Sequence, residues 1–177
     1  MAMSGVLAAE SPARVAASER LNEFKLEVEP TKSALYRFGT LAPILCKRDG
    51  LKRPARFSFL GILHYLRRRL SGTTTLGHKA QGLRMRKKLT ALGQRLQAMR
   101  SHGTARMRQY VTRHVRGQLQ YYGISGNTRS LRCYVFHGRR LLYKWLNRRS
   151  QRRSFNWARF DVWCSAWMPK VRIVHTL

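Results

Sequence analysis

Apolar side chains recur every three or four residues along the middle of the chain, and this spacing constrains the fold more than any other feature. Met85, Leu89, Leu92, Leu96 and Met99 follow one another at intervals of four, three, four and three residues. Such spacing places them on one face of a helix, away from the lysines and arginines between them. The pattern predicts a helix from Arg84 to Met99.

Three further helices are predicted downstream. One begins at Thr104, expected as its N-cap, and ends at Gly123. The next begins near Asn127 or Thr128, and a short one covers residues 157–168 before Pro169. The apolar faces of the two longer helices consist of Met107, Val111, Val115, Leu119 and Tyr122, and of Leu131, Val135, Leu142, Trp145 and Leu146. We therefore expect a small bundle joined by short glycine-containing turns.

The N-terminal part has a different pattern. A short helix is predicted from about Pro12 to Glu23. Alternating apolar residues within 24–28 and 35–38 predict a strand, a turn and a strand, and the run RFSFLGILHYL at 56–66 predicts a third strand. The expected fold class is α+β, mainly α, with a helix-and-strand part over residues 1–80. A basic bundle of three to four helices then covers residues 81–177.

The charge distribution indicates the kind of partner. Lysine and arginine number 36 against 7 acidic residues, a formal charge of +29, and no acidic residue lies between Asp49 and Asp161. Like charges at this density destabilise a compact state unless a polyanion neutralises them. The basic part also contains all four tryptophans, so we expect it to fold rather than to form a disordered tail. A nucleic acid is the expected partner.

Several kinds of site are not expected. Two-metal polymerases and nucleases need converging carboxylates to hold Mg²⁺, and here Asp49 and Asp161 stand alone in the sequence. We therefore expect no catalytic residue, no metal site and no cofactor. Cys46, Cys133 and Cys164 are widely spaced without neighbouring histidines, which favours unpaired thiols. No apolar run is long enough to span a membrane.

Basic and aromatic side chains are interleaved along the predicted helices. Arginine and lysine neutralise phosphates, while tyrosine rings and guanidinium planes stack on unpaired bases. The run NRRSQRR from Asn147 places four arginines in seven residues without an acidic neighbour. The candidate RNA-binding residues are Arg84, Lys87, Lys88, Arg95, Arg113, Arg116, Tyr121, Asn127, Arg129, Arg139, Arg140, Lys144, Arg148, Arg149, Arg152 and Arg153.

Three stretches follow one another in an order that matches a known family: GQLQYYGISGNTRSL at 117–131, LLYKWLNRRSQRRSFNWARF at 141–160 and RIVHTL at 172–177. They resemble the maturase-specific thumb, or domain X, of group II intron reverse transcriptases. RLNEFKLEVEPTKSALYRFG at 20–39 and FSFLGILHYL at 57–66 resemble the last part of the palm of these proteins. The resemblance covers about residues 7–177. It implies a bacterial, cytoplasmic, nucleic-acid-associated protein that binds intron RNA, aids its folding and splicing, and contacts the template–primer duplex.

The sequence departs from the family pattern at its start. The Tyr-X-Asp-Asp motif that holds the catalytic metal ions would lie just before the first predicted helix, where the sequence reads MAMSGV. The fingers and the first part of the palm have no counterpart, and no zinc-containing endonuclease domain is expected. The resemblance therefore implies a C-terminal maturase fragment that binds RNA without polymerase activity of its own.

Two alternatives remain open at the level of sequence. The first is the C-terminal piece of a split RNA-directed DNA polymerase, which needs an N-terminal fragment to supply the catalytic palm and its Mg²⁺. The second is a structural basic RNA-binding protein of the ribosomal type.

Tyr121 and Tyr122 precede the turn formed by residues 123–127. Successive residues of a helix point about 100° apart, so only one of the two rings can face the core. Because Tyr122 continues the apolar face of Val115 and Leu119, we expect Tyr122 to be buried and Tyr121 to lie near the RNA-facing surface. By the resemblance, this turn joins two thumb helices.

Overall fold

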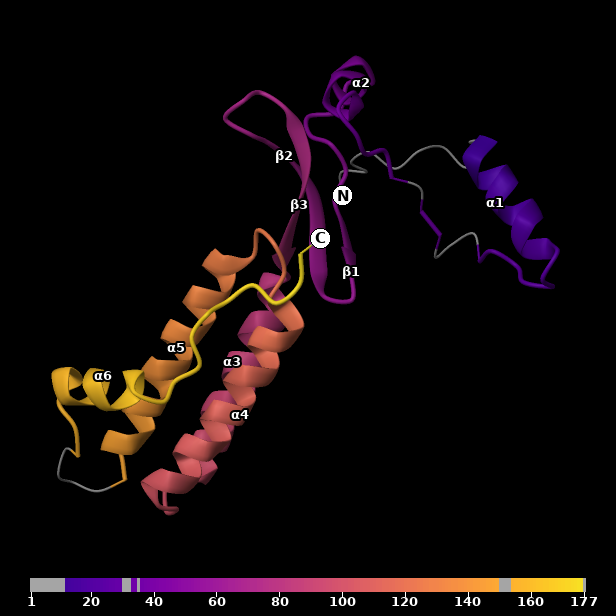
Figure 1. Ribbon diagram of the computed structural model, residues 1–177. Helices are drawn as coiled ribbons and strands as arrows, with labels where there is room; N and C mark the ends of the chain where they lie inside the picture. Colours follow the sequence, from indigo (N-terminus) through magenta and orange to yellow (C-terminus); the bar gives the residue numbers. More distant parts are fainter. Residues whose placement is uncertain (1–11, 30–32, 35, 150–153, 177) are drawn as a thin grey trace. The chain divides into compact units, whose positions relative to one another are not determined.

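The computed structural model describes residues 12–29, 33–34, 36–149 and 154–176. Over these ranges it confirms the predicted fold class, with six helices and a three-stranded antiparallel sheet (Figure 1). The described residues form two compact units. The first reaches to Phe59 and also contains Leu63–Gly77, whereas the second consists of Leu60–Ile62 and the chain from His78 onward. The boundary predicted from the sequence between the two parts of the chain lies after residue 80.

The first unit contains two helices, α1 (Pro12–Asn22) and α2 (Ala42–Arg48). The prediction of α1 is confirmed, but the strand expected at 24–28 is wrong. Lys25 adopts a left-handed φ of 58°, and the Leu26 N–H donates back to the Leu21 carbonyl at 3.1 Å, so a helix-terminating turn occupies this segment. No strand is present among the described residues of 35–38 either, while Leu35 lies outside them.

The sheet contains β1 (Phe57–Phe59), β2 (Ile62–Arg68) and β3 (Thr74–Ala80) in that order. The single strand predicted over 56–66 is wrong, because Leu60 and Gly61 have φ values of 49° and 81° and form a two-residue hairpin turn. A Cβ at Gly61 would also lie 2.9 Å from the Arg84 side chain and from the Tyr122 hydroxyl, so these side chains would have to shift. Strand β3 and helix α2 were not predicted from the sequence.

The second unit is a helical bundle of α3 (Gly82–Ala98), α4 (Thr104–Tyr122), α5 (Thr128–Asn147) and α6 (Trp157–Ser165). Helix α5 contacts α3, α4 and α6, so it is the centre of the bundle (Figure 1). The predicted apolar faces are confirmed in the core, where the fully buried residues include Leu92, Leu96, Met107, Val111, Val115, Leu131, Leu142 and Leu146. Tyr122 and Trp145 are also buried, as expected.

Two predicted helix ends differ from the structure. The N-cap position of α4 is Gly103 and carries no side-chain cap, so Thr104 is the first helical residue rather than the cap. Helix α6 ends at Ser165 instead of continuing to Met168, because the N–H groups of Trp167 and Met168 both donate to the Cys164 carbonyl in a closing turn.

Asn127 precedes α5 and is completely buried. Its Oδ1 accepts from the Ala80 N–H at 2.9 Å, and its Nδ2 donates to the Tyr122 carbonyl at 2.8 Å. The side chain therefore joins the end of β3 to the end of α4 at the point where α5 begins. It cannot contact RNA, and the expectation that Asn127 belongs to an RNA-binding surface is corrected.

Candidate nucleic-acid interface

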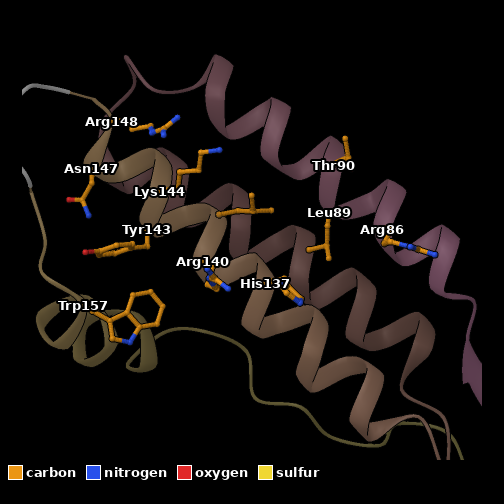
Figure 2. A pocket seen from close by; sticks show the side chains of 11 residues that line it. Arg86, Leu89, Thr90, His137, Arg140, Tyr143, Lys144, Asn147, Arg148 and Trp157 are labelled. Atoms are coloured by element: carbon orange, nitrogen blue, oxygen red, sulfur yellow. The ribbon is translucent and has the colours of Figure 1, made fainter.

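A groove of about 1110 Å³ lies among α3, α5 and α6 in the second unit (Figure 2). We call it the α3–α5–α6 groove. Its lining residues are Arg86, Leu89 and Thr90 from α3, His137, Arg140, Leu141, Tyr143, Lys144 and Asn147 from α5, Arg148 directly after α5, and Trp157 at the start of α6.

The charged side chains that line the groove are all cationic. Arg140 and Lys144 are four residues apart, which places them one above the other on the same face of α5, and Arg148 follows four residues later as the C-cap of the helix. Arg86 approaches from α3, and none of the described residues that line the groove carries a carboxylate. All four cations are exposed, so their charge is available to a ligand. The groove can therefore attract and neutralise phosphates.

Aromatic rings surround these cations. The Tyr143 ring meets the Trp157 indole edge to face, with centroids 5.0 Å apart and planes at 79°. The Lys144 ammonium lies 5.2 Å and the Arg148 guanidinium 5.9 Å from the Trp145 ring centroid. Contacts of this kind attract the cation to the ring face, so they orient the two basic side chains rather than leaving them free.

Hydrogen bonds hold the start of α6 beside the end of α5. The Asn147 Oδ1 accepts from the Phe155 N–H at 2.9 Å, and its Nδ2 donates to the Phe155 carbonyl at 3.1 Å. The Asn156 Oδ1 accepts from the Arg159 N–H at 2.8 Å and so caps α6. Because Trp157 directly follows this cap, the two asparagines together fix where its indole lies.

An ion pair between Arg139 of α5 and Asp161 of α6 ties the same two helices together. The Arg139 side chain is three-quarters buried, so it is engaged within the protein. Asp161 is the only acidic residue after Asp49. Its carboxylate is therefore committed to holding α6 in place, and Arg139 has a structural contact in addition to any contact with RNA that was expected of it.

The groove brings together three of the predicted RNA-binding residues, Arg140, Lys144 and Arg148. Others lie elsewhere on the second unit. Arg95 and Arg113 line a separate hollow between α3 and α4 together with His102, Arg106 and Tyr110. Lys87 lines a shallow hollow along α3. The predicted basic residues that are exposed outside these three hollows are Arg84, Lys88, Arg116 and Arg129.

Four further predicted residues lie in other settings or outside the described residues. Tyr121 is half-exposed as expected, but its hydroxyl donates to the Leu60 carbonyl at 2.8 Å. Arg149 is partly buried, and its Nε donates to the Leu146 carbonyl at 3.3 Å. Arg152 and Arg153 lie outside the described residues.

Other polar or aromatic residues line the groove but were not predicted from the sequence as site residues: Arg86, His137, Tyr143, Asn147 and Trp157. Tyr143 could have been found by its spacing, because it is three residues after Arg140 and therefore on the same helix face. No sequence spacing relates Trp157 to the basic residues of α5, since its position depends on how α6 packs against the bundle.

Buried titratable groups lie in the core rather than in the groove. His114 and Tyr134 are joined by a hydrogen bond of 2.7 Å between the Nε2 and the hydroxyl. Burial, with a smaller contribution from the Lys88 charge, lowers the pKa of His114. Burial raises the pKa of Tyr134 and also that of the Cys164 thiol. The three cysteines are unpaired.

Over the part of the chain that the structure describes, no cluster of three or more histidine, cysteine or acidic side chains could hold a metal ion. None of the helices in those ranges has the length and apolar character needed to cross a lipid bilayer. Comparison of the sequence with protein-family models and curated proteins, and of the chain with solved structures, found no match.

Proposed function

We propose that this protein is an RNA-binding protein of the group II intron maturase type, which binds intron RNA and stabilises its folded, splicing-competent form. The observation that carries the proposal is the α3–α5–α6 groove, where four cations and two aromatic rings meet without a carboxylate. Phosphate neutralisation by arginine and lysine supplies most sequence-independent affinity for nucleic acids. The exposed Trp157 ring and the partly exposed Tyr143 ring beside these cations add a means of contacting bases.

The resemblance to the maturase thumb supports the same proposal, because it includes the residues of the groove. Six of the eleven lining residues fall within the stretch 141–160 that resembles the thumb: Leu141, Tyr143, Lys144, Asn147, Arg148 and Trp157. The proposed site of action is the bacterial cytoplasm, on the intron RNA itself. A second RNA contact is proposed for the hollow lined by Arg95, Arg106 and Arg113.

Competition binding tests the proposal. The full chain is bound to a labelled group II intron RNA at physiological salt, and unlabelled intron RNA or ribosomal RNA of the same length is added as competitor. We expect the intron RNA to compete at a lower concentration. Equal competition by the two RNAs would favour a general basic RNA-binding protein of the ribosomal type and would contradict a maturase.

One observation favours a second candidate, the C-terminal part of a split reverse transcriptase. The first unit exposes large apolar side chains, with Phe24 69%, Leu41 63% and Ile44 64% exposed, and α1 buries no residue. Apolar surface of this kind marks contact sites for another chain. The test is primer extension with and without a separate fragment that carries the fingers and the catalytic palm. DNA synthesis only in the mixture would favour this candidate.

A further inference from the structure

We propose that the α3–α5–α6 groove accepts one unpaired nucleotide of the bound RNA, with its base stacked on Trp157 and the neighbouring phosphates against Arg140, Lys144 and Arg148. The inference rests on the proposed function, because it takes RNA binding as given and assigns to the groove the RNA feature that enters it.

The aromatic end of the groove presents a ring that is held in place but not covered. Trp157 is 42% exposed although it packs against two other rings. Tyr143 meets it edge to face, and Phe160, which is fully buried, lies with its ring centroid 5.5 Å from that of Trp157. The indole is therefore fixed from the protein side and keeps free surface on the groove that it lines (Figure 2).

The cations lie where the phosphates on either side of a stacked base could reach them. Arg140, Lys144 and Arg148 follow α5 at intervals of one turn, about 6 Å of helix rise for each interval of four residues. Figure 2 shows Lys144 and Arg140 on the same stretch of α5 as Tyr143, with Trp157 opposite on α6. A nucleotide at Trp157 would therefore have cationic partners along α5 for its backbone.

Chemistry favours an unpaired base over a paired one at this position. A paired base is already stacked between its neighbours, so its faces cannot reach a ring that lines a groove, whereas bulged and loop bases can be turned out onto aromatic side chains. Leu89 and Leu141 provide apolar walls that suit the faces of a base. The groove therefore suits an RNA with a base outside its helix.

The groove is expected to accept different bases similarly. The amide of Asn147 is the obvious group to read a base edge, but both of its ends are bonded to the Phe155 backbone. Stacking itself tolerates any base, because every base has a π-face. Specificity for an intron would then come from where the unpaired nucleotide lies in the folded RNA rather than from which base it carries.

The test compares three RNA hairpins bound to the full chain: one fully paired, one with a single bulged nucleotide, and one with the same bulge lacking its base. Stacking energies per base correspond to about a five- to 150-fold change in affinity. We expect the bulged hairpin to bind tighter than the abasic hairpin by a factor in this range, with similar values for adenine and uracil bulges. The fluorescence of 2-aminopurine placed in the bulge should fall on binding.

Substitutions test whether the preference for the bulged hairpin over the abasic hairpin depends on the Trp157 ring. Trp157→Ala should remove the difference between the bulged and abasic hairpins while leaving affinity for the fully paired hairpin unchanged, and Trp157→Phe should retain part of it. Phe24→Ala, which removes an exposed ring from the first unit, should keep the whole difference. If Trp157→Ala fails to fold, the affinities of the wild-type chain for the three hairpins and the 2-aminopurine fluorescence still show whether the groove binds an unpaired nucleotide.

The outcomes separate this inference from the function on which it rests. Tight and equal binding of the bulged and abasic hairpins, with unchanged 2-aminopurine fluorescence, would overturn the nucleotide site while leaving RNA binding intact. A preference that survives in Trp157→Ala would also overturn it. Failure of the wild-type chain to bind any of these hairpins or the intron RNA would overturn the proposed function itself.

Discussion

The side chain of Asn127 accepts a hydrogen bond from the backbone N–H of Ala80, a residue 47 positions earlier in the chain, at 2.9 Å. The same side chain donates to the Tyr122 carbonyl. Both bonds are buried, so Asn127 satisfies one backbone donor and one backbone acceptor that water cannot reach. This single amide links the strand that enters the second unit to the turn between α4 and α5.

Replacing Asn127 with alanine should destabilise the second unit. The change leaves the buried Ala80 N–H without a partner, which costs about 1–3 kcal/mol, while the Tyr122 carbonyl keeps its bond from the Ile124 N–H at 2.8 Å. Asn156→Ala is the matched control, because it removes an exposed helix cap whose loss typically costs about 1 kcal/mol. Urea denaturation measures both variants. An Asn127→Ala variant no less stable than Asn156→Ala would show that the buried amide does not hold this junction.

Trp145→Ala should unfold the bundle or weaken it severely. Trp145 is only 9% exposed, and truncation of a buried tryptophan typically costs about 3–5 kcal/mol, a large share of the stability of a small domain. Trp145→Phe is the control that keeps a ring in the core and should cost less. Thermal unfolding followed by circular dichroism measures both. If Trp145→Ala is fully stable, its ring does not contribute to the core as the structure indicates.

Replacing Arg140, Lys144 and Arg148 together with glutamine should weaken RNA binding without unfolding the protein. The three side chains are exposed, and the loss of their cation–π contacts is offset by relief of like-charge repulsion. Each phosphate contact contributes about 0.7–0.9 to the slope of log affinity against log salt, so we expect the slope to become shallower by about 2–3.

The matched control for this salt experiment replaces Arg100, Arg132 and Lys170 with glutamine, which removes the same charge from exposed positions outside the groove and outside the hollow lined by Arg95 and Arg113. Its slope should change less than that of the groove variant. Equal changes would mean that net charge, and not the α3–α5–α6 groove, determines the affinity. Both variants should have melting temperatures close to that of the wild type.

Stability should fall as the pH is lowered through the range in which an unfolded histidine gains its proton. Burial lowers the pKa of His114 below its ordinary value of 6.5, so the unfolded chain binds more protons than the folded chain just below that pH. The stability contributed by neutral His114 is complete above about pH 6.5 and declines between that pH and the lowered folded pKa. His114→Gln should show a smaller decline between pH 7 and pH 5 in urea denaturation. Parallel curves for the two proteins would contradict this role of His114.

The helical bundle could be predicted from the sequence because its apolar residues keep a helical period. The apolar residues from Met107 to Tyr122 keep this spacing without interruption. Helix α4 occupies Thr104–Tyr122 as predicted, except that its N-cap is Gly103 rather than Thr104. Burial of Tyr122 rather than Tyr121 follows from the same period. Long helices with an apolar face are the elements for which local pattern and tertiary packing agree.

The first unit was harder to predict because its elements are short or lack a periodic pattern. Helix α2 spans two turns, too few for a period to emerge, and β3 carries threonine, histidine and lysine where apolar alternation would mark a strand. At 57–65 the alternation was regular, but the Leu60–Gly61 turn interrupted it. In that case the conformational freedom of one glycine outweighed the pattern.

Only part of the candidate site could be predicted, for a physical reason. Arg140, Lys144 and Arg148 share a helix face, which their spacing reveals. Trp157 and Arg86 join them only through the packing of three helices, which no local pattern encodes. Asn127 was assigned to the RNA-binding surface because it belongs to the turn that the resemblance places in the thumb, whereas its side chain turns inward to two backbone groups.

Ultraviolet crosslinking of the full chain to a group II intron RNA, followed by mass spectrometry of the crosslinked peptides, tests the central claim most directly. Tyr121 and Trp157 are similarly exposed, at 49% and 42%, so accessibility alone gives no preference between them. If the α3–α5–α6 groove binds RNA, crosslinks should appear at Tyr143 and Trp157 and should disappear in the triple glutamine variant. Crosslinks at Tyr121 with none at Tyr143 or Trp157 would contradict the claim and move the interface away from the groove.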